Sequence, residues 1–203
     1  MHAVQPHLSK CFDAIKRIEF SPEKNSKEII AMISSEGERV DFSESVFAEG
    51  NVEFWLSNIE KMMVKSLYDL TKKAWQEYPE DGRKRNHWLF DYPAQPVLTI
   101  DQVMWTNGCQ SAISEIEKGK NKRALEEFRD FSNEQINAMV GLVRGELTGM
   151  QRTEMGALIV LDVHALTVVQ NMIAINVNNM NNFEWTRQLR YYWEEDVDDC
   201  VAR

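Results

Sequence analysis

The sequence is poor in cysteine, glycine, proline and positive charge. Its three cysteines, Cys11, Cys109 and Cys200, lie far apart and form no CxxC pair, which is typical of reduced thiols rather than of a disulfide framework. Nine glycines and five prolines in 203 residues are too few for a loop-rich β-sandwich or a low-complexity chain. Asp and Glu number 32 against 23 Lys and Arg, and the net charge of -9 argues against a nucleic-acid binder and against docking on an anionic membrane.

Motifs for catalysis or metal binding are also missing. The sequence contains no GxxxxGK[ST] phosphate loop, no GxGxxG and no GxSxG, and no histidine has a Cys or His partner at zinc-ligand spacing. No Glu is followed three residues later by His, as a carboxylate-metal helical bundle would require. His164, between two apolar neighbours, is interpreted as a core histidine. The residues alone therefore predict a non-catalytic module with no catalytic, cofactor-binding or metal-binding residue.

No uninterrupted apolar run is long enough to span a membrane. The longest apolar stretch, residues 155–175, is interrupted by Asp162 and by several other polar residues. Because it is apolar on most faces, it is interpreted as a helix in the middle of a bundle, surrounded by other helices. The first ten residues lack the apolar region of a signal peptide.

Apolar residues recur at helical spacing along most of the chain. Stripes with steps of three and four residues predict helices over residues 6–20, 51–78, 97–116, 121–147 and 151–175, and a last helix that starts near residue 183. Gly119 is expected to close the third of these helices, and Asn107 with Gly108 to weaken or bend it.

Residues 29–42 follow a different pattern. Two short β-prone runs flank a glycine-containing loop at residues 34–38, which predicts a hairpin, expected to be the only sheet. The predicted fold class is thus mainly α: an elongated helical bundle with one small β-hairpin. Two domains are expected, residues 1–50 with the first helix and the hairpin, and residues 51–203 with the helical bundle.

Two clusters of charged residues are candidate binding sites. Arg83, Lys84 and Arg85 form a basic patch on a connector, which is either a solvated loop or a docking contact for an acidic partner surface. Residues 194–199 hold five acidic side chains but lack the glycine and the final glutamate of an EF-hand loop, so they are interpreted as a solvated helix end.

Several segments resemble the dynein heavy-chain family, at the C-terminal part of its linker. The resemblance rests on six stretches that occur in the same order: PHLSKCFDAIKRIEF, IIAMISSEGERVDF, GNVEFWLSNIEKMM, QVMWTNGCQSAI, LVRGELTGMQRTEMGALIVLDVHALTVV and FEWTRQLRYYW. The last two are the most specific, and FEWTRQLRYYW is similar to the segment that leads the chain into the first AAA+ module. The sequence of the predicted hairpin, residues 29–42, resembles axonemal family members more than cytoplasmic ones.

The resemblance implies a function that composition does not supply. Dynein heavy chains are microtubule motors driven by a ring of AAA+ modules, and the linker is a helical lever that bends and straightens with the nucleotide cycle. This chain would be the ring-proximal part of that lever, without catalysis of its own, and ATP and Mg would bind in the parent motor beyond Arg203. The residues expected to join it to the first module are Gln188, Leu189, Arg190, Tyr191, Tyr192 and Trp193.

The implied partners are the AAA+ ring of the same chain, the rest of the linker and tail, and the microtubule through the parent motor. Neither nucleic acid nor a membrane is among them. The implied location is the cytoskeleton of the cytoplasm, in a ciliary or flagellar axoneme. An alternative function is that of a free-standing helical adaptor that binds a partner helix in a groove.

Overall fold

The computed structural model describes residues 4–79 and 85–203 and divides into two compact units, Met1–Gln76 and Glu77–Arg203. Each unit combines helices with one small antiparallel sheet, so the predicted mainly α fold class is confirmed. The division after Gln76 differs from the expected boundary after residue 50. Helix α2 (Val52–Gln76) packs on strands of the first unit, which keeps it with the preceding residues.

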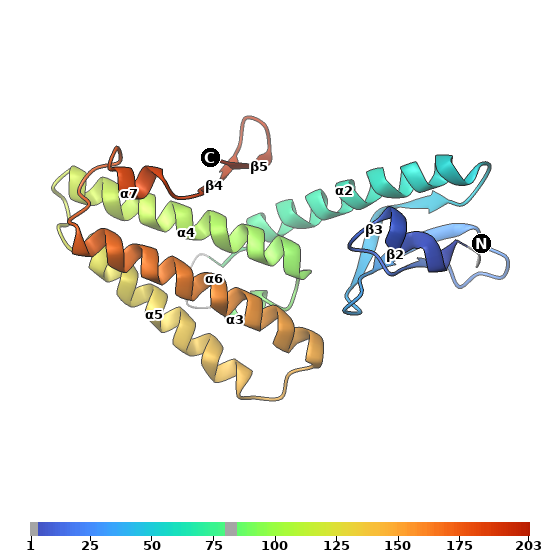
Figure 1. Cartoon of the computed structure of the whole chain (residues 1–203), viewed down its shortest axis with the longest axis horizontal. Coiled ribbons are helices and arrows are strands. Elements are labelled where there is room, and N and C mark those ends of the chain that lie inside the picture. The colour runs from blue at the N-terminus through green and yellow to red at the C-terminus, as the bar shows by residue number, and fades with distance from the viewer. Residues whose placement is uncertain (1–3, 80–84) are drawn as a thin grey trace. The chain divides into compact units, whose positions relative to one another are not determined.

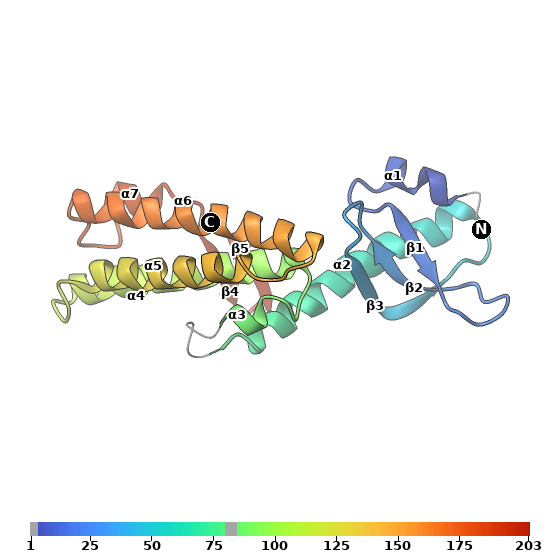
Figure 2. The ribbon, with the colours of Figure 1, turned by 90° about the horizontal axis from the view of Figure 1, so that it is seen from below.

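The first unit is a three-stranded antiparallel sheet with α2 packed across it (Figure 2). The strands follow one another in sequence order, and they are β1 (Arg17–Phe20), β2 (Glu28–Ile33) and β3 (Arg39–Phe47). The β2–β3 pair confirms the hairpin predicted over residues 29–42.

Buried cross-strand pairs hold this sheet to α2. Ile29 lies opposite Val46, and Met32 lies opposite Val40, all of them in the core of the unit. Trp55, from the first turns of α2, packs into the same core. Ile29 and Met32 are three positions apart, and the register shift between Ile29 and Ala31 lets both face the core. The sheet and the helix thus bury a common apolar layer.

The helix predicted over residues 6–20 is wrong. The chain forms only η1 (Gln5–His7) and α1 (Leu8–Cys11) before it joins the sheet as β1. Ile18 of β1 is buried and pairs with Met32, so strand pairing overrides a helical stripe that is too short to be stable alone.

Gln5 covers the outer edge of β1. Its side-chain Nε2 donates to the carbonyl of Ile18 at 2.8 Å, and its Oε1 accepts from the amide of Ile18 at 3.2 Å. A side-chain amide has the same donor and acceptor as a peptide group, so it makes the two hydrogen bonds that a neighbouring strand would make.

The second unit is built on three long helices that lie side by side (Figures 1 and 2). They are α4 (Ala94–Glu117), α5 (Ala124–Val143) and α6 (Gly149–Ala174). The short helix α3 (Arg85–Trp88) precedes them, and helix α7 (Phe183–Thr186) and strands β4 (Tyr191–Glu194) and β5 (Asp199–Ala202) follow.

Local signals define the ends of these helices. At the end of α4, the amide of Lys120 bonds the carbonyl of Glu115, and Gly119 has a φ of 66°, as in a Schellman motif. Gly119 therefore closes the helix as predicted. Thr148 and Gln151 form a reciprocal capping box at the start of α6.

Helix α6 is not surrounded on all sides, contrary to the prediction. It packs on α4 and α5, but Val160 is 69% exposed and Val163 is 47% exposed. Among the described residues, α6 is the one helix long and apolar enough to cross a membrane, with a mean hydropathy of 1.7. Because its buried side packs against two other helices, its apolar composition serves the bundle core on that side.

The last predicted helix is also wrong beyond Thr186. Residues 191–202 form an antiparallel hairpin, so the first sheet is not the only one, and residues 195–198 are its turn rather than a helix end. The backbones of Arg190 and Arg203 exchange two hydrogen bonds of 2.9 and 2.8 Å, which close the open end of the hairpin. Aromatic and β-branched residues, such as the facing pair Tyr192 and Val201, favour strand pairing.

Gly108 allows α4 and α5 to approach closely, and α4 runs through it without interruption. A Cβ at this position would lie 2.7 Å from Cζ of Phe128 and closer still to Cε2. We expect Gly108→Ala to push the Phe128 ring out of place and to lower the free energy of unfolding by about 1–3 kcal/mol. Urea unfolding monitored by circular dichroism measures this change.

The matched control is Gly141→Ala in α5, where an added Cβ meets no atom within 4 Å. It should stabilise the chain by about 0.5–1 kcal/mol, because alanine favours the helix. Adding Phe128→Leu to Gly108→Ala should recover part of the loss. Equal effects of the two glycine substitutions would contradict a close contact at Gly108.

Candidate functional site

Three charged side chains meet in the interior of the second unit. Arg85 of α3 donates through Nη1 to Oδ1 of Asp101 on α4, and through Nη2 to Oδ2 of Asp162 on α6. The side chains are 3%, 4% and 12% exposed, respectively. We call these three residues the ion cluster. It joins a four-residue helix to two of the long helices.

The ion cluster adjoins a cleft of about 280 Å³ between α4, α5 and α6. Arg85 also approaches the sulfur of Met139 on α5, at 3.5 Å from Nη2. Burial raises the pKa of Tyr78, beside the cluster, to about 12, and the negative charge of Asp101 adds to this effect. Burial likewise raises the pKa of Asp101, although Arg85 opposes the shift.

Arg85 is therefore not part of an exposed basic patch. The sequence placed it on the connector beside Arg83 and Lys84, either in a solvated loop or at a docking contact. Its guanidinium is instead buried and paired within its own unit. Arg83 and Lys84 lie outside the described residues, so docking through them stays a prediction.

The residues predicted to lie next to a ring lead into the C-terminal hairpin. Gln188 follows α7 and donates through Nε2 to the carbonyl of Glu184 at 3.0 Å. Leu189 is 60% exposed. Arg190 lies with its guanidinium carbon 5.5 Å from the ring centre of Trp185, a cation–π contact. Tyr191, Tyr192 and Trp193 form the first three positions of β4.

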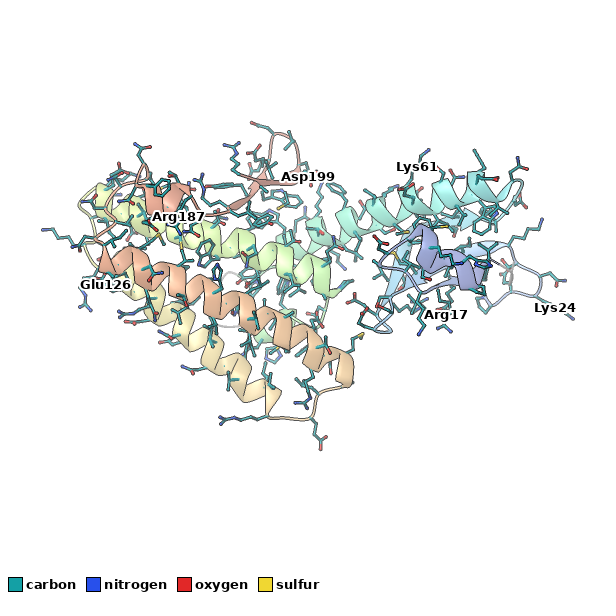
Figure 3. The ribbon with its side chains drawn as sticks, viewed as in Figure 1. Arg17, Lys24, Lys61, Glu126, Arg187 and Asp199 are labelled. Atoms are coloured by element: carbon teal, nitrogen blue, oxygen red, sulfur yellow. The ribbon has the colours of Figure 1, made fainter. Side chains whose placement is uncertain are left out.

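Thr106 connects this hairpin to α4. Its Oγ1 accepts from the amide of Tyr191 at 3.2 Å and donates to the carbonyl of Gln102 at 2.9 Å, and the side chain is fully buried. Asp199, labelled in Figure 3, marks where the second strand of the hairpin begins. The Thr106 hydroxyl thus accepts a hydrogen bond from the amide of Tyr191 and holds the start of β4 against α4.

Contacts between aromatic rings also hold the C-terminal hairpin and α7 to α4. Trp185 of α7 is fully buried, with its ring centre 6.1 Å from that of Trp105 on α4. Arg203 lies over the ring of Tyr192 at 5.7 Å and pairs with Glu194 across the hairpin. The hairpin, α7 and α4 are therefore held by ring contacts as well as by hydrogen bonds.

A groove of about 380 Å³ runs beside this segment, between α4 and α6. Trp105, Val168 and Leu189 contribute apolar surface to it. His164 of α6 also borders the groove and is exposed, so its interpretation as a core histidine is wrong. Two residues earlier on the same helix, Asp162 turns toward Arg85, since positions two apart on a helix face different ways.

Sequence reasoning missed three residues that define these contacts: Asp101, Thr106 and Asp162. Asp101 and Thr106 had no distinguishing signal, being single polar residues in a predicted helix. Asp162 did carry one, because an acidic residue inside a strongly apolar helix needs a partner when buried. Among residues 4–79 and 85–203, no three His, Cys, Asp or Glu side chains are grouped in a way that would hold a metal ion.

The fold and these contacts define a helical module whose buried polar groups bind its own segments together. Residues 1–74 match the family model described as dynein heavy chain, N-terminal region 2. The matched residues end close to Gln76, where the first compact unit ends.

Curated relatives extend the match over nearly the whole chain. The chain is 39% identical to dynein axonemal heavy chain 6 of Homo sapiens over 99% of its length, and 42% identical to the human heavy chain 12 over 95%. It is 36% identical to the human heavy chain 2 over 99% of its length. The chain is thus homologous to a segment of axonemal dynein heavy chains, which confirms the resemblance found in the sequence. It spans 5–6% of the length of these three relatives.

Removing the cation of the ion cluster should destabilise the second unit strongly. Arg85→Met leaves two carboxyl groups buried without their partner, and we expect it to lower the free energy of unfolding by about 3–5 kcal/mol. Guanidinium unfolding followed by tryptophan fluorescence measures the loss.

Arg129→Met is the matched control for Arg85→Met. Arg129 pairs with Asp130 at the surface of α5, so its replacement should change the free energy of unfolding by no more than about 0.5 kcal/mol. Replacing Asp101 and Asp162 by Leu together with Arg85→Met should recover much of the stability. A loss for Arg85→Met no larger than that of the control would show that the cluster is not needed for folding.

Loss of the Thr106 hydroxyl should weaken the attachment of the hairpin to α4. Thr106→Val keeps the side-chain shape but leaves the amide of Tyr191 without its acceptor, at a cost of about 1–3 kcal/mol. Hydrogen exchange at the Tyr191 amide should become faster by about tenfold or more. Thr99→Val is the control, because the Thr99 hydroxyl bonds the carbonyl of Gln95, one turn back on the same helix. Unchanged exchange at Tyr191 would argue against this attachment.

Proposed function

We propose that this chain is a mechanical segment of an axonemal dynein heavy chain, the ring-proximal part of its linker. The observation that carries the proposal is the homology over 95–99% of the chain to axonemal dynein heavy chains. In this role the chain performs no catalysis. It transmits to the rest of the linker and tail a movement that begins in the AAA+ ring of the same heavy chain.

The internal contacts of the second unit support a role in transmission. Helices resist bending, and a bundle whose members are joined by buried polar contacts moves as one body. The ion cluster joins α3, α4 and α6, and Thr106 joins α4 to β4. Residues 188–193, in or next to the hairpin, would receive the movement from the ring and pass it to α4.

The proposed cofactors, partners and location are those of the parent motor. ATP and Mg act in its AAA+ modules, and the microtubule is bound by other parts of the heavy chain. Neither nucleic acid nor a membrane has a part in this function. The place of action is the cytoskeleton of a ciliary or flagellar axoneme, as the names of the relatives indicate.

The test uses a complete axonemal heavy chain that carries this segment. Replacing Tyr191, Tyr192 and Trp193 by Ala removes the half-buried aromatic side chains of β4. The attachment of β4 to α4 should then be less rigid. We expect microtubule gliding to slow several-fold while ATP turnover is retained, because energy release and movement become uncoupled. Gliding speed and ATP turnover are measured on the same preparation.

The control variant replaces Glu195 and Asp196, which are exposed in the turn of the same hairpin, by Ala. It should glide at the wild-type speed. Wild-type gliding of the aromatic variant would contradict the proposal, and so would ATP turnover by the purified 203-residue chain alone.

A second candidate function is that of a helical adaptor. The groove between α4 and α6, with Leu189 exposed beside it, has the apolar surface that an amphipathic partner helix requires. An adaptor would bind its partner without any nucleotide-dependent step. The gliding experiment separates the two functions, because only the lever requires a stiff junction at β4.

A further inference from the structure

The ion cluster carries excess negative charge when all of its members are ionised. One guanidinium, that of Arg85, faces the two carboxylates of Asp101 and Asp162. All three side chains are at least 88% buried. Full ionisation would leave one negative charge uncompensated inside the protein, which is among the most costly features that a fold can contain.

No second cation among the described residues faces the cluster. The charged groups that act on Asp101 are Arg85 from α3 and Asp162 from α6. Tyr78, from the segment before α3, faces the cluster with a neutral phenol, and Met139 of α5 offers a thioether. The other residues that line the adjoining cleft from α4 and α5 are uncharged. Within the part of the chain that the structure describes, the second carboxylate of the cluster thus has no cation of its own.

A proton is the neutralising group that the geometry allows. Arg85 binds Asp101 through Nη1 and Asp162 through Nη2, so the two carboxyl groups flank one guanidinium. Two carboxyl groups that share one site hold a proton as a pair, because both cannot ionise at low cost. Burial, opposed by Arg85 and reinforced by Asp162, raises the pKa of Asp101 to about 8.

We propose that Asp101 and Asp162 share one proton around neutral pH, and that this proton neutralises the ion cluster and fastens α3 to α4 and α6. The protonated carboxyl donates an O–H···O hydrogen bond to its partner, and Arg85 pairs with the remaining negative charge. When the proton leaves for solvent, two carboxylates repel each other beside a single cation. The attachment of α3 then loosens.

The direction of the pH dependence follows from the pKa of Asp101. In the unfolded chain this carboxyl has its ordinary pKa of 3.8, so the folded chain binds more protons between that value and about 8. The contribution of the shared proton to stability is complete below pH 3.8. It falls as the pH rises and is lost above about 8.

Proton release from the folded 203-residue chain tests the proposal. Potentiometric titration from about pH 6 to about pH 9 is carried out on the wild type, Asp101→Asn, Asp162→Asn and Asp130→Asn. Asp130 is an exposed aspartate of α5 and serves as the control. The wild type and the control should each release about one proton more than either cluster variant, because both carboxyl groups are needed to hold it.

Equal release by all four proteins would overturn the proposal. Retention of the extra proton in either cluster variant would also overturn it, since the proton would then belong to one carboxyl alone. Infrared spectroscopy of the wild type keeps the test decisive if a variant fails to fold. A protonated-carboxyl stretch at neutral pH that disappears above about pH 8 supports the shared proton, and its absence at neutral pH overturns it.

Discussion

The second unit is arranged around a guanidinium group that cannot remain buried without its carboxylates. Arg85 belongs to a helix of four residues, which is too short to form by itself in water. Two charged contacts, together with the packing of Trp88 between Tyr78 and Tyr92, hold this turn in place. The order of the segment before α4 thus depends on residues of α4 and α6.

Helix α4 connects this cluster to the C-terminal hairpin. Asp101 and Thr106 are five positions apart on it, which places them about 140° apart around the helix axis. One side of α4 therefore holds Arg85 while another holds the amide of Tyr191. Both contacts are buried, and the second joins residues 85 positions apart, so α4 is the element that positions both α3 and β4.

The long helices were predictable because their signals are local. Apolar stripes of five or more turns, the glycine at position 119 and the capping residues act within a few positions of one another. The stripes over residues 6–20 and after residue 183 were shorter, and there the pairing of strands decided the structure. A propensity scale does not contain that information, since a strand is stabilised by a partner that lies elsewhere in the chain.

The candidate site was predictable only in part, for the same reason. The residues expected near a ring were placed by resemblance, and the structure adds where each lies. The partners of Arg85 lie 16 and 77 positions away, so nothing beside it in the sequence distinguishes a buried ion pair from a solvated basic loop. Composition likewise showed that α6 is apolar but not which side of it faces the core.

The hydrogen bonds of Gln5 have a consequence for the solubility of the first unit. A sheet edge with free peptide groups is a template on which a second molecule can add a strand, and such growth leads to aggregation. At Ile18 in β1 both peptide groups are already occupied by an amide from the same chain. A single polar side chain thus occupies the peptide groups through which a second molecule would pair with this edge.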